Sequence, residues 1–169
     1  MKTWLEWATL TLFATMAVAL VSFQLYKGWP AGDYTDAMAK GQYQKAREHL
    51  AAQVQQGNPE AITSLANLHD LGLGGQPDYP RASNLYHAAA VKGFGAAQLN
   101  LGHLYRQGLG VSKDVERAYA WYLQANIANN AWAEYYITQL SSELTLTPLQ
   151  MATIKERFSK LENLAKEPL

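Results

Sequence analysis

The feature that most constrains this chain is an internal repeat, because the sequence matches itself when it is shifted by 36 residues without a gap. The shift pairs identical residues at many positions, including Gly72 with Gly108, Asp78 with Asp114, Tyr86 with Tyr122 and Ala89 with Ala125. Repeats of this length are typical of arrays in which each unit buries its apolar face against its neighbours. We therefore expect a stack of similar units.

Each unit has the pattern of two helices joined by a glycine-containing turn. Ala97, Leu101 and Leu104 have helical spacing, and Gly108 follows where a left-handed turn would end the helix. Asp114 is a good N-cap residue for the second helix. The predicted fold class is all-α: a short α-solenoid of helix-turn-helix repeats, preceded by one transmembrane helix.

The repeat frame also predicts the organisation of the whole chain. The transmembrane helix and a linker occupy residues 1–30, and the solenoid occupies residues 31–169. Within the solenoid we expect clear repeats at 58–93 and 94–130, a degenerate repeat at 33–57, and a degenerate repeat with a capping helix at 131–166. The second helix of the first unit is expected from Tyr43 to Gln56, and the capping helix from Leu149 to about Ala165.

The segment LNLGHLYRQGLGVSKDVERAYAWYLQA, from Leu99 to Ala125, closely resembles a Sel1-like repeat, a relative of the tetratricopeptide repeat. It carries the LG, LY, G-x-G-V, D and A-x-x-W-Y-x-x-A features of that repeat. The unit from Asn58 to Gly93 matches less well, with Gly75 where Val111 stands. The resemblance implies a protein-binding scaffold.

The amino-terminal region is expected to anchor the chain in a membrane. Residues 7–26 include no charged side chain, and 20 helical residues span the roughly 30 Å hydrocarbon layer of a bilayer. A small, mildly polar stripe along this helix would suit packing against another membrane helix; it consists of Ala8, Thr11, Thr15, Ala19 and Ser22. Such residues are also common in any single-pass anchor. The competing interpretation is a signal peptide cleaved after Ala19.

Composition and motifs argue against several other classes of protein. The formal net charge is zero, which disfavours nucleic-acid binding, and the absence of cysteine excludes a disulfide scaffold or a cysteine nucleophile. No metal-ligand pair or catalytic motif is present, and the glycines around Gly74 recur with the repeat, so we interpret them as a turn. His49 and His69 stand at repeat positions held by aromatic residues, which predicts packing roles. We expect no enzyme activity, no cofactor, no metal and no small-molecule substrate.

The candidate binding surface is the concave face formed by the first helices of the repeats. The residues predicted on it are Glu60, Thr63, Asn67, Asp70, Leu99, His103, Arg106, Trp132, Tyr135 and Gln139. The aromatic group of Trp132, Tyr135 and Tyr136 is either part of this surface or packed under the capping helix.

The sequence thus predicts a single-pass protein of a bacterial inner membrane, with its solenoid in the periplasm. Its expected function is to bind other protein subunits as an accessory or assembly subunit of a membrane complex, with residues 7–26 in contact with lipid. The alternative is a secreted or periplasmic regulator of the same repeat class whose signal peptide is removed.

Overall fold

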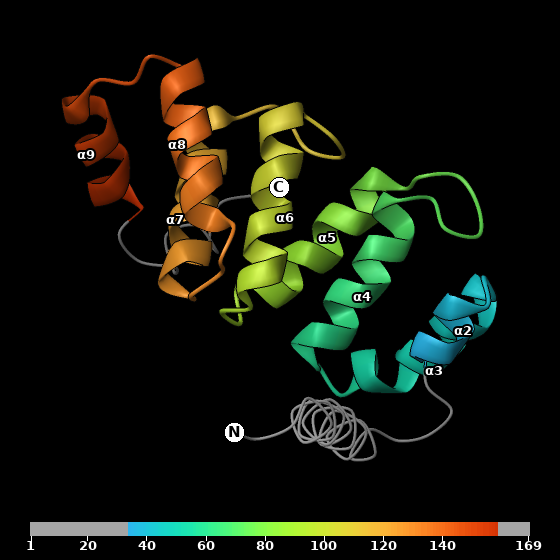
Figure 1. Ribbon diagram of the computed structural model, residues 1–169. Helices are drawn as coiled ribbons and strands as arrows, with labels where there is room; N and C mark the ends of the chain where they lie inside the picture. Colours follow the sequence, from blue (N-terminus) through green and yellow to red (C-terminus); the bar gives the residue numbers. More distant parts are fainter. Residues whose placement is uncertain (1–33, 159–169) are drawn as a thin grey trace, which may run out of the picture.

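The computed structural model describes residues 34–158, and within that range the chain forms eight α-helices and no strand (Figure 1). The helices are α2 (Tyr34–Ala39), α3 (Tyr43–Gln55), α4 (Pro59–Asp70), α5 (Tyr79–Ala90), α6 (Gly95–Gln107), α7 (Val115–Ile127), α8 (Ala133–Glu143) and α9 (Pro148–Arg157). The predicted all-helical solenoid is therefore confirmed for this part of the chain. None of these helices combines the length and apolarity needed to cross a membrane. The predicted anchor at residues 7–26 lies outside the described residues.

The helices stack as consecutive hairpins. Helix α4 packs against α5 and α6 packs against α7, while α5 and α7 also contact the first helix of the following unit. Figure 1 shows the hairpins following one another in a row from α2 to α9. Each second helix is therefore shared between two units, so no unit is shielded from water by its own residues alone.

Some helices begin at a residue whose side chain caps the backbone. The Asn58 Oδ1 accepts hydrogen bonds from the backbone N–H groups of Glu60 and Ala61 at 2.9 and 3.3 Å. The Asp114 carboxylate accepts one from the backbone N–H of Arg117 at 3.0 Å, which confirms its predicted role as an N-cap.

The predicted glycine turns are backbone turns that bring neighbouring units close together. Gly108 ends α6 in the left-handed conformation, with φ of 75°. At Gly110, a Cβ atom would lie only 2.3 Å from the backbone carbonyl carbon of Tyr79, so a side chain there would collide with the start of α5. The glycine loop of one unit is thus packed against the second helix of the preceding unit.

Small residues allow the helices of one hairpin to cross closely, as the sequence predicted. Tyr122 of α7 is fully buried over Gly102 of α6, where a Cβ atom would lie 2.6 Å from the Tyr122 Cε1. In the preceding hairpin, Tyr86 is likewise fully buried, and Ala66 occupies the position equivalent to Gly102. A large ring over a small residue is therefore the repeated packing unit of the core.

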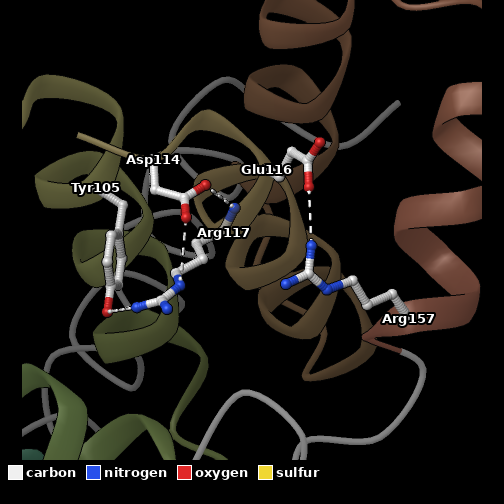
Figure 2. A network of polar contacts seen from close by, with 5 residues as sticks. All are labelled: Tyr105, Asp114, Glu116, Arg117 and Arg157. Atoms are coloured by element: carbon white, nitrogen blue, oxygen red, sulfur yellow. Dashed lines mark hydrogen bonds and ion pairs between the residues drawn. The ribbon is translucent and has the colours of Figure 1, made fainter. Parts of the chain in front are cut away.

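Figure 2 shows polar contacts that join α7 to Asp114 in the loop before it, to Tyr105 of α6 and to Arg157 of α9. The Arg117 guanidinium lies 3.3 Å from the Asp114 carboxylate and donates to the Tyr105 hydroxyl at 3.3 Å. Arg157 of α9 forms an ion pair with Glu116 of α7 at 3.3 Å, but both side chains are more than half exposed. Exposed ion pairs contribute little free energy, so α9 is held mainly by its apolar residues.

One prediction for the terminal units is wrong. His49 is exposed, although the equivalent Trp121 is buried against His87 of the preceding second helix; within the described residues no second helix precedes α3 to cover His49. Helix α9 ends at Arg157, and the predicted helical residues from 159 to about Ala165 lie outside the described residues. The Phe158 side chain turns into the core there, and its carbonyl accepts a hydrogen bond from Gln124 at 3.2 Å.

Replacing Gly102 by alanine tests the close crossing of α6 and α7. We expect Gly102→Ala to lower the free energy of unfolding by about 1–3 kcal/mol, because the new methyl group overlaps the Tyr122 ring despite the better helix propensity of alanine. Urea unfolding followed by circular dichroism measures the change. Gly75→Ala is the matched control, since a Cβ atom there meets nothing within 4 Å. An equal effect of both substitutions would contradict the proposed crossing.

Candidate partner-binding surface

The first helices of three successive units, α4, α6 and α8, carry the residues predicted to form a binding surface. We call the solvent-accessible side of these helices the first-helix face. Six predicted residues are partly exposed there: Glu60, Asn67, Asp70, His103, Arg106 and Gln139. Trp132 and Tyr135 are exposed to 65% and 52%, so they do not pack under α9.

Two predicted surface residues are instead buried. Thr63 is 4% exposed and its hydroxyl donates to the Pro59 carbonyl at 2.7 Å. Leu99, which occupies the same repeat position in α6, is 8% exposed and belongs to the core. Assigning this position to the surface was wrong, because in α4 and α6 it points toward neighbouring helices.

In α4 the partly exposed polar residues form a hydrogen-bonded group with their neighbours. The Tyr86 hydroxyl lies 2.5 Å from Asn67 Oδ1 and 3.2 Å from Asp70 Oδ2, so its proton is shared between two acceptors. Asn100 of α6 donates to the same Asn67 oxygen at 3.1 Å. This group therefore joins both helices of one unit to the first helix of the next.

An aromatic version of the same arrangement occurs one unit later. The Tyr122 hydroxyl lies 2.9 Å from His103 Nδ1, and the His103 ring packs edge-on against Tyr136 of α8, with ring centroids 4.3 Å apart. Arg106 forms an ion pair with Glu143 across the same junction. We call these two groups together the polar ladder; it comprises Asn67, Asp70, Tyr86, Asn100, His103, Tyr122 and Tyr136.

Burial favours the uncharged forms of the titratable groups in the polar ladder. It raises the pKa of Asp70, and it lowers the pKa of His103, which the nearby Arg106 lowers further. Burial also raises the pKa of Tyr122 to about 12. The lowered pKa favours an uncharged His103, whose unprotonated nitrogen can accept a hydrogen bond from Tyr122.

This chemistry suits hydrogen bonding and stacking. Between residues 34 and 158 the structure contains no group of three or more side chains that could hold a metal ion. A polar surface with aromatic rings can donate to and accept from a polypeptide backbone, which is how helical-repeat grooves recognise extended segments.

Sequence reasoning missed Asn100 and Glu143 as members of this surface. The repeat frame held a signal for Asn100, because Asn67 and Asn100 are 33 residues apart and so are the contacting pair His103 and Tyr136. A residue on one first helix thus meets the residue three places earlier in the next unit. The partner of Arg106 had no such signal, because Glu143 lies in the irregular last unit.

Comparison with protein families identifies the two central hairpins. The family described as Sel1 repeat matches residues 59–94 and 95–130. These two units are similar to Sel1 repeats. The match includes α4 to α7, which carry the ring-over-small-residue packing and every polar-ladder residue except Tyr136.

Relatives with known names share this region. Protein sel-1 homolog 2 of mouse is 39% identical over 64 residues, which is 37% of this chain and 9% of the mouse protein. Sel1-repeat-containing protein YjcO of Escherichia coli K12 is 30% identical over 100 residues, which is 56% of this chain and 43% of that protein. The alignments therefore span less than half the length of these relatives.

Solved structures of Sel1-repeat proteins have the same fold. A Sel1 repeat protein from Oxalobacter formigenes is 35% identical, with a TM-score of 0.61 over 65% of this chain and 45% of the other. The protective antigen c5321 of uropathogenic E. coli is 29% identical, with a TM-score of 0.61 over 72% of this chain and 26% of the other. Sel1-repeat proteins generally mediate protein–protein interactions.

The lowered pKa of His103 predicts a stability that depends on pH. As pH falls below about 6.5, the unfolded chain takes up a proton on this histidine before the folded chain does, so acid lowers the free energy of unfolding. We expect His103→Gln to reduce the dependence of the free energy of unfolding on pH between about pH 7.5 and 5.5. Part of the slope will remain, because burial also lowers the pKa of His69 and His87.

Urea unfolding at a series of pH values measures this slope. His49→Gln removes an exposed histidine outside the polar ladder and is the matched control. A slope that His103→Gln leaves unchanged would contradict the buried, neutral state of this residue.

Proposed function

We propose that this protein is a membrane-tethered scaffold that holds protein partners against its first-helix face. The observation that carries the proposal is the polar ladder, whose contacts join α4 to α6 and α6 to α8 and place hydrogen-bonding groups along the first helices. The surface is rigidly supported because every ladder residue contacts a second unit or a buried tyrosine. Rigid support lowers the entropy cost of binding an extended segment.

The tether is proposed from the sequence. Residues 7–26 form an uncharged run with Trp7 at one end and Tyr26 at the other, which suits a helix held at both membrane interfaces. In this proposal the protein is a single-pass component of a bacterial inner membrane with its repeats in the periplasm. Its partners are the subunits of a membrane complex, for which it serves as an accessory or assembly subunit.

The second candidate is a secreted or periplasmic Sel1-repeat regulator. It is favoured by Ala17-Val18-Ala19, which has the small-x-small pattern of a signal-peptidase site. Both candidates use the same binding surface, and they differ only in whether the chain keeps its first residues. Neither candidate involves catalysis, and we propose that the protein is not an enzyme.

The state of the amino terminus distinguishes the two candidates. We expect the mature protein to remain in the membrane fraction after alkaline carbonate washing, because an uncharged run of this length partitions into the bilayer. Mass spectrometry of the purified protein should find a chain that retains residues 7–26. A mature chain that begins after Ala19 would contradict the anchor and support the secreted regulator.

Substitutions on the first-helix face test the binding surface. We expect Glu60→Ala combined with Gln139→Ala to reduce, by about tenfold or more, the amount of membrane complex that co-purifies with the detergent-solubilised protein, because both side chains are accessible on this face. Gln55→Ala is the matched control on α3, a second helix. Equal recovery of one stoichiometric complex by all variants would contradict this surface. Purification of the chain alone would contradict the role as a subunit.

A further inference from the structure

The last unit departs from the repeat in a way that leaves one side of α8 uncovered. In the two central hairpins the second helix packs tightly against its own first helix, whereas α9 packs mainly against α7. Figure 1 shows α9 to one side of α8, beyond the loop that joins them. Helix α8 therefore lacks the hairpin contact that α4 and α6 have.

The repeat frame identifies the uncovered positions. Residues 62, 63 and 66 of α4 and residues 98, 99 and 102 of α6 are buried, but the equivalent residues of α8, Glu134, Tyr135 and Thr138, are exposed. Trp132, one turn before them, is 65% exposed. The opposite side of α8 is packed normally, with Ala133 and Leu140 buried. The exposed side thus continues a packing surface that is used inside the stack.

Two aromatic side chains on this surface, Trp132 and Tyr135, are more exposed to solvent than is usual for residues of their size. Tyr135 takes the place of the buried Leu99, and a large exposed aromatic pair is typical of interface centres. We define the α8 patch as Trp132, Tyr135, Thr138 and Ser142, all of which are exposed.

The size of the side chains makes the α8 patch complementary to itself. Its first half carries the large Trp132 and Tyr135, and its second half carries the small Thr138 and Ser142. In an antiparallel crossing of two α8 helices, Trp132 covers Ser142 of the other copy and Tyr135 covers Thr138. Such an arrangement has two-fold symmetry, the commonest symmetry of homo-oligomers.

The few charged side chains near α8 are compatible with the antiparallel crossing of two α8 helices. Between residues 126 and 150 the only charged side chains are Glu134 and Glu143, and Glu143 already pairs with Arg106 of its own chain. The antiparallel crossing places Glu134 beside Gln139 of the other copy, so no two acids face each other. The opposite end of the stack is a poor match, because α3 exposes the charged residues Lys45 and Glu48.

The exposed packing positions of α8, the complementary sizes of its side chains and the absence of facing acids all support a contact between two copies. We propose that the α8 patch is a self-association surface, on which a second copy of this chain packs its own α8 in the antiparallel direction. The proposal goes beyond the proposed scaffold function and does not depend on it, since the α8 patch lies at the end of the stack. One consequence is that each dimer presents to its partners two copies of the part of the first-helix face formed by α4 and α6, while Trp132 and Tyr135 are occupied by the dimer contact.

The absence of cysteine from the natural chain allows a direct test. We expect full-length Thr138→Cys, solubilised in detergent, to form a covalent dimer with a short bis-maleimide. Asn84→Cys, exposed on α5, is the matched control and should remain a monomer. Adding Trp132→Ala and Tyr135→Ala to Thr138→Cys should lower the dimer yield by more than about tenfold. Because Trp132 and Tyr135 are exposed, replacing them should change the unfolding midpoint of the protein little.

Several outcomes would overturn the proposal. Thr138→Cys that links no more than Asn84→Cys would show that the copies do not meet at α8. Equal, strong linking of both variants would place the contact elsewhere in the chain. Cross-linking of Thr138→Cys to a different protein in intact membranes, without the dimer, would assign the α8 patch to another partner. None of these results bears on whether Glu60→Ala, which changes a residue of α4 outside the α8 patch, weakens partner binding.

Discussion

The structure depends on the packing of a large ring over a small residue at each crossing of two helices. Tyr122 lies over Gly102, Tyr86 and Ala66 hold the equivalent positions in the preceding hairpin, and all four residues are buried. Because every second helix also packs against the next unit, this contact links intra-unit and inter-unit packing. Stability in such a stack is close to a sum of unit and nearest-neighbour terms, which gives the end units the least support.

The same tyrosines connect the core to the binding surface. Their rings are in the core, while their hydroxyls reach Asn67 and His103 on the first helices. The polar ladder is therefore positioned by the packing that holds the stack together. A surface built this way can present hydrogen-bonding groups at fixed spacing, which is what recognition of an extended protein segment requires.

The repeat made most of the fold predictable from the sequence. Glycine turns, the Asp114 cap and the small residues at crossings each follow from local chemistry that recurs in register. Errors arose where a residue's environment depends on a neighbouring unit. His49 had no second helix before α3 in the described residues to cover it, and Thr63 and Leu99 are buried at a repeat position predicted to be on the surface. The exposed side of α8 could not be predicted from the sequence either, because it depends on α9 packing mainly against α7.

The central claim is that partners bind along the first helices. Hydrogen–deuterium exchange of the free protein and of its co-purified assembly tests this claim most directly, because it reports on each helix separately. The account predicts that assembly slows exchange in peptides from α4, α6 and α8 and leaves α3 and α5 unchanged. Protection confined to α3 and α5, or no difference between the two states, would contradict it.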